Sequence, residues 1–182
     1  ALPLPAQQVD VYDVASDKWL AGGWTDQAGQ ATITNLPAGR MTLFAGANNL
    51  VFVPHWLGDT PHRDAALALD LGEAMPTVAC EVTLGHGGTL QAMVQTDAGE
   101  PIDGAQVSVF LPDDSVYKQA STAPDGRTTI GGLADGTLRA AAYKLPDFET
   151  SYWQHADTLA TATPMEMSSG TTLEVAFSLR PR

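Results

Sequence analysis

The feature that most constrains the fold of this chain is an internal repeat, because the first half of the sequence can be laid over the second. Residues 1–12 align with residues 99–110, and Pro, Gln and two Val positions coincide. After one residue of slippage, turn glycines and apolar residues continue to match: Gly29, Ile33, Leu36 and Gly39 align with Gly126, Ile130, Leu133 and Gly136. Near the end of each half, Cys80, Val82 and Leu84 align with Val175, Phe177 and Leu179. Self-similarity of this kind predicts two copies of one structural unit.

The repeat also predicts where the domains meet. We expect a first domain over residues 1–84, a short glycine-rich hinge over residues 85–88 and a second domain over residues 89–182. With 182 residues, the chain is long enough for two small domains.

Within each half the apolar residues alternate with polar ones, as half-buried β-strands require. Val9 and Val11 show this period of two, and so do Val107 and Val109. Between the alternating runs lie turn sequences such as Asp26–Gly29 and its counterpart around Gly126, which supply a glycine for a positive φ. Short strands with regular turns predict an all-β fold of two tandem Greek-key sandwiches, transthyretin-like or immunoglobulin-like.

The order of these features resembles the carboxypeptidase regulatory-like family of transthyretin-like domains. The resemblance rests on Gly99 to Phe110 and on the hairpin and strand-start motifs: Thr25–Gly29 with Leu36–Gly39, and Asp125–Gly126 with Leu133. These motifs are specific for a fold and weak for a function. The resemblance implies a bacterial domain that is secreted or on the cell surface, often as an appendage of a larger protein. A related family cross-links such domains by an isopeptide bond from a Lys in the first strand. Residues 89–96 contain no Lys, so we expect no such bond.

The first half lacks one strand that the second half has. The alternating run at residues 89–96 precedes Pro101, whereas the first half begins at the equivalent of the following turn. We expect an unpaired strand edge at Val9 and Val11, because a sheet that loses a strand exposes backbone donors and acceptors. Three explanations stay open: the strand lies in upstream sequence, it is dispensable, or another chain supplies it by β-strand addition.

The charge of the chain narrows its partners. Nine Lys and Arg against 21 Asp and Glu give a formal net charge of -12, which disfavours nucleic acid and anionic membranes. No stretch is long and apolar enough to predict membrane insertion. The single cysteine, Cys80, alternates in phase with Val82 and Leu84, so we expect a small buried hydrophobic residue.

No catalytic, cofactor-binding or metal-binding motif is recognisable in the sequence, and we predict a protein that is not an enzyme. We expect the histidines and the acidic turn residues to be solvated and not to bind a metal. Among the tryptophans, Trp56 aligns with Trp153, which predicts a packing role for both. Trp19 aligns with Tyr117 next to a turn, and this pair is the candidate for an exposed platform on which a sugar ring could stack.

These observations predict a non-catalytic structural or spacer module of a secreted or cell-surface bacterial protein. A sharper version is a filament or surface-appendage subunit, whose protein partner is an upstream domain or a neighbouring subunit that adds a strand. The alternative is a carbohydrate-binding appendage of a secreted hydrolase or peptidase, with a glycan as its partner.

Overall fold

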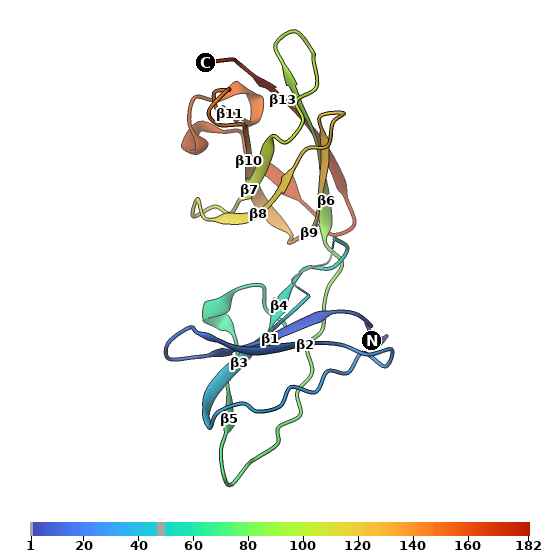
Figure 1. Cartoon of the computed structure of the whole chain (residues 1–182), viewed down its shortest axis with the longest axis vertical. Coiled ribbons are helices and arrows are strands. Elements are labelled where there is room, and N and C mark those ends of the chain that lie inside the picture. The colour runs from blue at the N-terminus through green and yellow to red at the C-terminus, as the bar shows by residue number, and fades with distance from the viewer. Residues whose placement is uncertain (1, 47–49) are drawn as a thin grey trace. The chain divides into compact units, whose positions relative to one another are not determined.

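The computed structural model describes residues 2–46 and 50–182. The chain divides into two compact units, Ala1–His86 and Gly87–Arg182, here called unit 1 and unit 2 (Figure 1). The described residues form β-strands and three short 3₁₀ helices, with no α-helix among them. The prediction of an all-β fold is therefore confirmed. In the same described part of the chain, no helix has the length and apolar character needed to cross a membrane.

Unit 2 is a two-layered sandwich. Its first sheet has the order β11-β10-β7-β8, with β12 also paired to β10, and its second sheet has the order β13-β6-β9. The strands of unit 2 are β6 (Gly88–Thr96), β7 (Gln106–Phe110), β8 (Val116–Ser121), β9 (Arg127–Leu133), β10 (Gly136–Tyr143), β11 (Ser151–Tyr152), β12 (Met165–Met167) and β13 (Thr172–Leu179). Short 3₁₀ helices span Trp153–His155 and Leu159–Thr161.

The core of unit 2 is made by the alternate residues of both sheets. Val107 and Val109 of the first sheet are fully buried, and so are Leu90 and Val94 of the second. They belong to one cluster of buried residues, which is the expected interior of a sandwich. Burial of this apolar surface is the main force that holds the two layers together.

Unit 1 has one sheet, and its strand order matches that of the first sheet of unit 2. Its order is β2-β1-β3-β4, with β5 also paired to β3. The strands are β1 (Gln8–Asp13), β2 (Trp19–Trp24), β3 (Gly39–Ala45), β4 (His55–Trp56) and β5 (Leu69–Leu71), with a 3₁₀ helix at Arg63–Ala65. Within the described residues of unit 1, no second sheet is present.

The free strand edge that we expected at Val9 and Val11 is not there. Both residues lie in β1, which pairs with β2 on one side and with β3 on the other. Strand β1 is thus an interior strand of its sheet. Its backbone groups already bond to β2 on one side and to β3 on the other. The described residues of unit 1 contain no counterpart of β6, and the place of such a strand would not be beside β1.

The glycines at the predicted hinge have a packing role in unit 2. Gly88 is the first residue of β6, and both Gly87 and Gly88 are buried. A Cβ atom on Gly87 would lie 2.6 Å from backbone atoms of Gly132, so any larger residue would push β6 away from β9. A Cβ atom on Gly85 would meet nothing within 4 Å. Flexibility over residues 85–88 stays a prediction.

Candidate functional site

The candidate site follows from the way that unit 2 uses strand β6. This strand is the middle of its sheet: it runs antiparallel to β9 and parallel to β13. Leu90 pairs with Ile130 on one side and with Leu173 on the other. Without β6, neither β9 nor β13 would have a partner in that sheet, because the two strands never pair with each other.

Unit 1 has the two flanking segments but no strand between them. The repeat aligns residues 31–36 with β9 and residues 78–84 with β13. Neither segment forms a strand, and Figure 1 draws both as extended loops. Among the described residues, no backbone-to-backbone hydrogen bond is made by residues 31–36 or by residues 78–84. We use the term open strand position for the place beside these two segments that corresponds to the place of β6 in unit 2.

The backbone of residues 78–84 has one side occupied and one side open. The N–H of Thr83 donates to Asp59 Oδ1 at 2.6 Å, and its carbonyl oxygen lies 2.7 Å from His55 Nδ1. The carbonyl of Gly85, two residues on, accepts from the N–H of Val53 at 2.9 Å. Because successive residues of an extended chain direct their hydrogen-bonding groups to opposite sides, the groups of Val82 and Leu84 face away from this contact. They face the open position.

Two side-chain contacts place the flanking segments against different strands at the same end of the sheet. Ile33 lies against β2, since its Cγ1 is 3.6 Å from where a Cβ on Gly23 would be. Leu84 lies beyond the end of β3, since its Cδ1 is 2.8 Å from the corresponding position on Gly46. Val9 and Leu43 point to one face of the sheet and are only partly buried, whereas Val11 and Ala45 on the same face are buried. An incomplete second layer explains why Val9 and Leu43 are less buried than their fully buried counterparts in unit 2.

Asn35 has the backbone conformation of the matching bulge residue of β9. Asn35 has φ of 59°, and Gly132, which it matches in β9, has φ of 65°. The register of β6 against β9 shifts at this place in unit 2, which marks a β-bulge. Asn is among the few residues besides Gly that adopt this conformation readily. Unit 1 therefore keeps this bulge residue although no strand pairs with residues 31–36 among the described residues.

The turn that would hold the end of such a strand is also preserved. In unit 2, the N–H of Ile102 donates to the carbonyl of Val94 at 3.0 Å, and the N–H of Val94 donates to Gly126 at 2.8 Å. Gly126 has φ of 74° and Gly29 has φ of 71°, so the turns are alike. In the described part of unit 1, the N–H of Leu4 and the carbonyl of Gly29 have no such partner.

Cys80 differs from the prediction for a physical reason. We expected a buried residue, but the side chain is exposed, although partial burial raises the pKa of its thiol. Its counterpart Val175 is buried because β6 and the opposite sheet cover it. Cys80 thus has the sequence pattern of a core residue. Among the described residues of unit 1, no strand covers it.

Trp19 and Tyr117 do not occupy matching positions in the two units, and they do not form the same kind of exposed platform. Trp19 pairs with Tyr12 and is 53% exposed. Tyr117 is partly buried against the core of unit 2, its hydroxyl accepts from the N–H of Ala134 at 3.3 Å, and burial raises its pKa. Both hairpins have the same register shift, but six residues separate Tyr12 from Trp19 and five separate Phe110 from Val116. Because the turn of unit 1 is one residue longer, the residue at the position of Trp19 is Val116. Tyr117 is therefore wrong as an exposed platform.

A different pair of tryptophans is exposed on unit 1. Trp24 is 59% exposed and, like Trp19, lies in β2. Trp19 Nε1 donates to Asp10 Oδ1 at 3.0 Å, and Gln8 Nε2 donates to Asp10 Oδ2 at 2.8 Å. Asp10 pairs with Gly22 and its carboxylate occupies the space where a side chain at Gly22 would be. Polar groups therefore fix Trp19 on the face that Asp10 and Gly22 share.

The alignment of Trp56 with Trp153 is also shifted by the structure. Trp56 pairs with Phe44, and the residue in the matching pair of unit 2 is Tyr152, opposite Ala141. Trp56 lies 4.7 Å from Phe44 between ring centroids and carries the Arg63 guanidinium over its ring at 4.5 Å. Trp153 contacts Phe177 edge-on at 6.0 Å. Both tryptophans pack against neighbours, as predicted, but on different surfaces.

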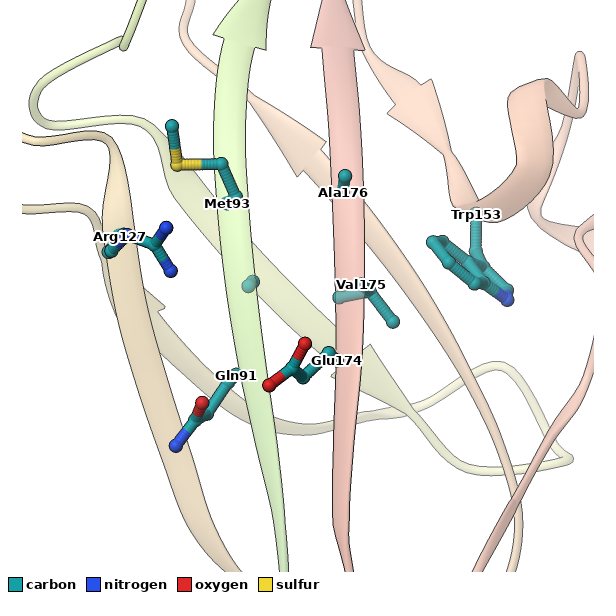
Figure 2. A pocket seen from close by; sticks show the side chains of 8 residues that line it. Gln91, Met93, Arg127, Trp153, Glu174, Val175 and Ala176 are labelled. Carbon is teal, nitrogen blue, oxygen red and sulfur yellow. The ribbon is translucent and has the colours of Figure 1, made fainter.

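Unit 2 has a hollow of about 400 Å³ beside β6 and β13. Figure 2 shows Gln91, Arg127 and Glu174 around it, with Trp153 on the other side of β13. Among the described residues that line it there is no His, Cys or Ser, so a nucleophile and its base are not brought together.

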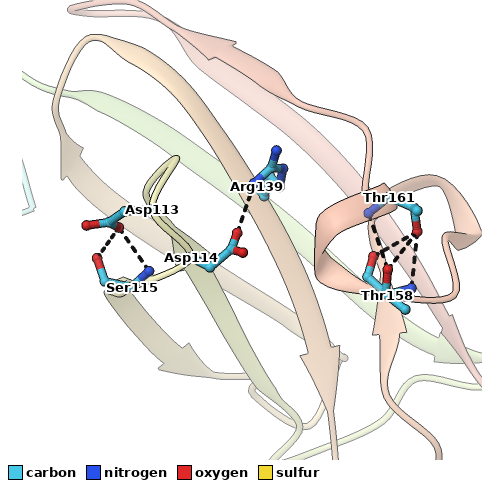
Figure 3. Close-up of polar contacts among 6 residues, drawn as sticks. All are labelled: Asp113, Asp114, Ser115, Arg139, Thr158 and Thr161. Carbon is cyan, nitrogen blue, oxygen red and sulfur yellow. Dashed lines mark hydrogen bonds and ion pairs between the residues drawn. The ribbon is translucent and has the colours of Figure 1, made fainter.

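The acidic turn of unit 2 is used for local structure. Asp113 Oδ1 accepts from the N–H and the hydroxyl of Ser115, at 3.0 and 2.6 Å, and Asp114 forms an ion pair with Arg139 at 2.9 Å (Figure 3). The same view shows the reciprocal hydrogen bonds of Thr158 and Thr161 that cap a 3₁₀ helix. In the described residues, no three His, Cys, Asp or Glu side chains gather as a metal site.

Comparisons with known proteins found only distant likenesses. No protein-family model matches the chain, and no curated protein matches its sequence. The chain is similar to the TIE protein of Bacillus anthracis, with 15% identity and a TM-score of 0.43 over 97% of this chain and 31% of that one. It is also similar to a minor pilin of Streptococcus agalactiae (13% identity, TM-score 0.40, 99% and 84% covered) and to the shaft pilin SpaA of Lactobacillus rhamnosus GG (14%, 0.41, 100% and 94%). The chain thus spans less than a third of the length of the first of these proteins. At these values the likeness is remote, and the function proposed below does not depend on it.

Proposed function

We propose that this chain is a non-catalytic assembly module of a secreted or cell-surface protein, in which unit 1 is completed by a β-strand from outside the described residues. One observation carries the proposal: residues 31–36 and 78–84 flank an open strand position that β6 fills in unit 2. Strand addition gains main-chain hydrogen bonds and covers apolar side chains at the same time. The solved proteins named above include pilins, and an assembly role for this chain is a proposal that its own geometry supports.

The finer parts of the proposal follow from the repeat. We take the two units to be copies of one carboxypeptidase regulatory-like domain, because their sheets share the same strand order and the same hydroxyl bridge. Thr25 Oγ1 accepts from the N–H of Gln7 at 2.9 Å and donates to the carbonyl of Leu4 at 2.7 Å. Thr122 Oγ1 makes the matching bonds to Ala105 and Ile102 at 2.9 and 2.6 Å. The domain limits 1–84 and 89–182 belong to this proposal.

The test is amide hydrogen exchange of the full chain, with and without an added strand in front of residue 1. The extension copies residues 88–100 of this chain, which include β6 and its turn. We expect exchange at residues 31–36 and 78–84 to slow by at least about tenfold, because each newly bonded amide then needs a local opening before it exchanges.

The matched control is the same extension with Leu90→Asp and Val94→Asp in the copied strand. These changes keep the length and the turn but place charges where apolar side chains would be buried, so protection should be lost. Exchange that stays fast with the unmodified extension would contradict the proposal, since a complete unit 1 would then not need the strand.

A glycan-binding role is the second candidate, and the two exposed tryptophans favour it. Trp19 and Trp24 present large apolar surfaces beside the hydrogen-bonded Asp10, and sugar rings stack on aromatic faces. A glycan array would test it, with Trp24→Ala as the variant and Tyr117→Phe in unit 2 as the control. Saturable binding that Trp24→Ala abolishes would support a carbohydrate-binding appendage, and no binding by the native chain would exclude it for the glycans tested.

A further inference from the structure

We infer that the strand that completes unit 1 comes from a partner polypeptide and enters in one direction and one register, with a small uncharged residue opposite Cys80. This inference rests on the proposed function, because it specifies the occupant of the same open position. The occupant is an extended segment of nine residues with apolar side chains at its third and seventh positions.

The direction of the strand follows from the two segments that would flank it. In unit 2, β6 is parallel to β13 over the whole length of β13, from Thr172 to Leu179. Residues 78–84 match β13, and their open backbone groups lie on the side that β6 occupies in unit 2. A parallel ladder uses slanted hydrogen bonds and cannot be replaced by an antiparallel one without new geometry at each residue. The incoming strand therefore runs parallel to residues 78–84.

The register follows from the pairing of each residue of β6. Ala92, the fifth residue of β6, pairs with Val175 on one side and Thr128 on the other. The matching residues of unit 1 are Cys80 and Ala31. The fifth residue of the incoming strand would thus lie beside Cys80. Because a one-residue slip would turn every apolar side chain to the solvent, the register is strongly specified.

The same pairs give the chemistry of the other positions. Leu90, the third residue of β6, would have its counterpart beside Ile33 and Val78, which are both partly buried and lack a cover. Val94, the seventh, would have its counterpart beside Val82. These neighbours are apolar, so a charged residue at the third or seventh position would remain without a partner.

Charge selects the residue at the sixth position. Met93 of β6 pairs with Ala176, whose match in unit 1 is Glu81, an exposed acidic residue. A Lys or Arg at the sixth position would lie next to this carboxylate on the solvent face. Opposite charges on neighbouring strands attract, whereas an acidic residue there would be repelled by a chain of net charge -12. The partner segment is therefore neutral or basic.

The occupant comes from outside the described residues of the molecule. Within residues 2–46 and 50–182, the alternating apolar runs are either in paired strands or are the two flanking segments themselves. Strand β6 is held in unit 2 by partners on both sides. Moving β6 into unit 1 would open the same position in unit 2, so exchange within the chain gains nothing.

The experiment uses the full chain and its only cysteine as a reporter. Synthetic peptides copy β6, GTLQAMVQT, with a single cysteine that is activated as a mixed disulfide with thionitrobenzoate. The thiolate of Cys80 attacks the peptide sulfur, a new disulfide forms, and thionitrobenzoate leaves and is measured by its absorbance. We expect the peptide with Ala92→Cys to couple at least about tenfold faster than those with Leu90→Cys, Val94→Cys or Gln91→Cys.

Two charge variants of the Ala92→Cys peptide provide the matched control for direction. With the central cysteine beside Cys80, Met93→Lys lies beside Glu81 in a parallel strand, whereas Gln91→Lys lies there in an antiparallel one. Faster coupling with Gln91→Lys than with Met93→Lys would overturn the direction, and faster coupling through Val94→Cys or Leu90→Cys would overturn the register. For the sixth position, we expect Met93→Lys to bind up to about fivefold more tightly than Met93→Glu. A preference for Met93→Glu would overturn the charge argument.

The two proposals can fail separately. If the strand fused in front of residue 1 protects residues 31–36 and 78–84 from exchange but no peptide couples faster than activated glutathione, the partner polypeptide is wrong and the proposed function stands. If neither the fused strand nor any peptide has an effect, both are wrong.

Discussion

The hydroxyl bridge that unit 1 and unit 2 share allows the effect of the missing layer to be measured. Thr122 is 4% exposed, and its Oγ1 bonds the N–H of Ala105 and the carbonyl of Ile102, which are themselves buried. Thr122→Val keeps the shape of the side chain and removes both bonds. Because a buried donor or acceptor left without a partner costs about 1–3 kcal/mol, we expect unit 2 to lose about 2–4 kcal/mol of stability.

Thr25 is the matched position in unit 1, where the same two bonds lie in a less buried place. Water can replace the lost hydroxyl there, so Thr25→Val should cost about 1 kcal/mol or less. Thr122→Ser, which keeps the hydroxyl, is the control for the loss of the methyl group. The midpoint of unit 2 should fall by roughly 4–8 °C for each kcal/mol.

Hydrogen exchange under increasing denaturant, with peptides resolved by mass spectrometry, gives the free energy of opening for each unit separately. Equal losses for Thr122→Val and Thr25→Val would refute the reasoning, because burial would then not decide the cost. A loss from Thr122→Ser as large as that from Thr122→Val would show that packing of the methyl group, and not the hydroxyl bridge, carries the effect.

Two further predictions concern unit 2. Gly87→Ala should destabilise unit 2 by about 1–3 kcal/mol, because the added Cβ meets the backbone of Gly132. Gly85→Ala, whose added Cβ meets nothing, should have no measurable effect. The denaturant midpoints of both variants test this prediction. Burial lowers the pKa of Lys118 from 10.5 to about 8. At pH values between these two pKa values, the unfolded state binds more protons than the folded state. The stability of unit 2 should therefore rise as the pH increases from 7.5 to 9.5. Lys118→Met should remove this rise, and a slope that persists in the variant would contradict the assignment.

Local patterns in the sequence predicted the strands well. The alternation at residues 89–96 corresponds to β6, and the turn glycines Gly29 and Gly126 have the positive φ that was expected. These features depend on nearby residues, since strand alternation and turn chemistry are local properties. The expectation that the first half lacks one strand comes from the repeat and stays a prediction.

Features that depend on residues far apart in the sequence were harder to predict. Val9 and Val11 seemed to border the gap because they come first in the chain, but a strand's neighbours are set by topology and not by sequence order. The pairing of Trp19 with Tyr117 failed because the extra residue of the first half lies in the turn between Tyr12 and Trp19, and the sequence alone does not show where in that region the slippage falls. The exposure of Cys80 was missed because its pattern describes the complete sandwich, while the described part of unit 1 has an incomplete one.

The unpaired backbone of residues 31–36 and 78–82 also bears on how long a copy of the chain survives. Endoproteases hold their substrates as extended chains, so the shape that is suited to a partner strand is suited to cleavage as well. When the open position is filled, both segments become interior to a sheet and cleavage needs prior unfolding. Degradation would then remove copies that have found no partner and spare those that have, so turnover itself would act as the quality control of assembly.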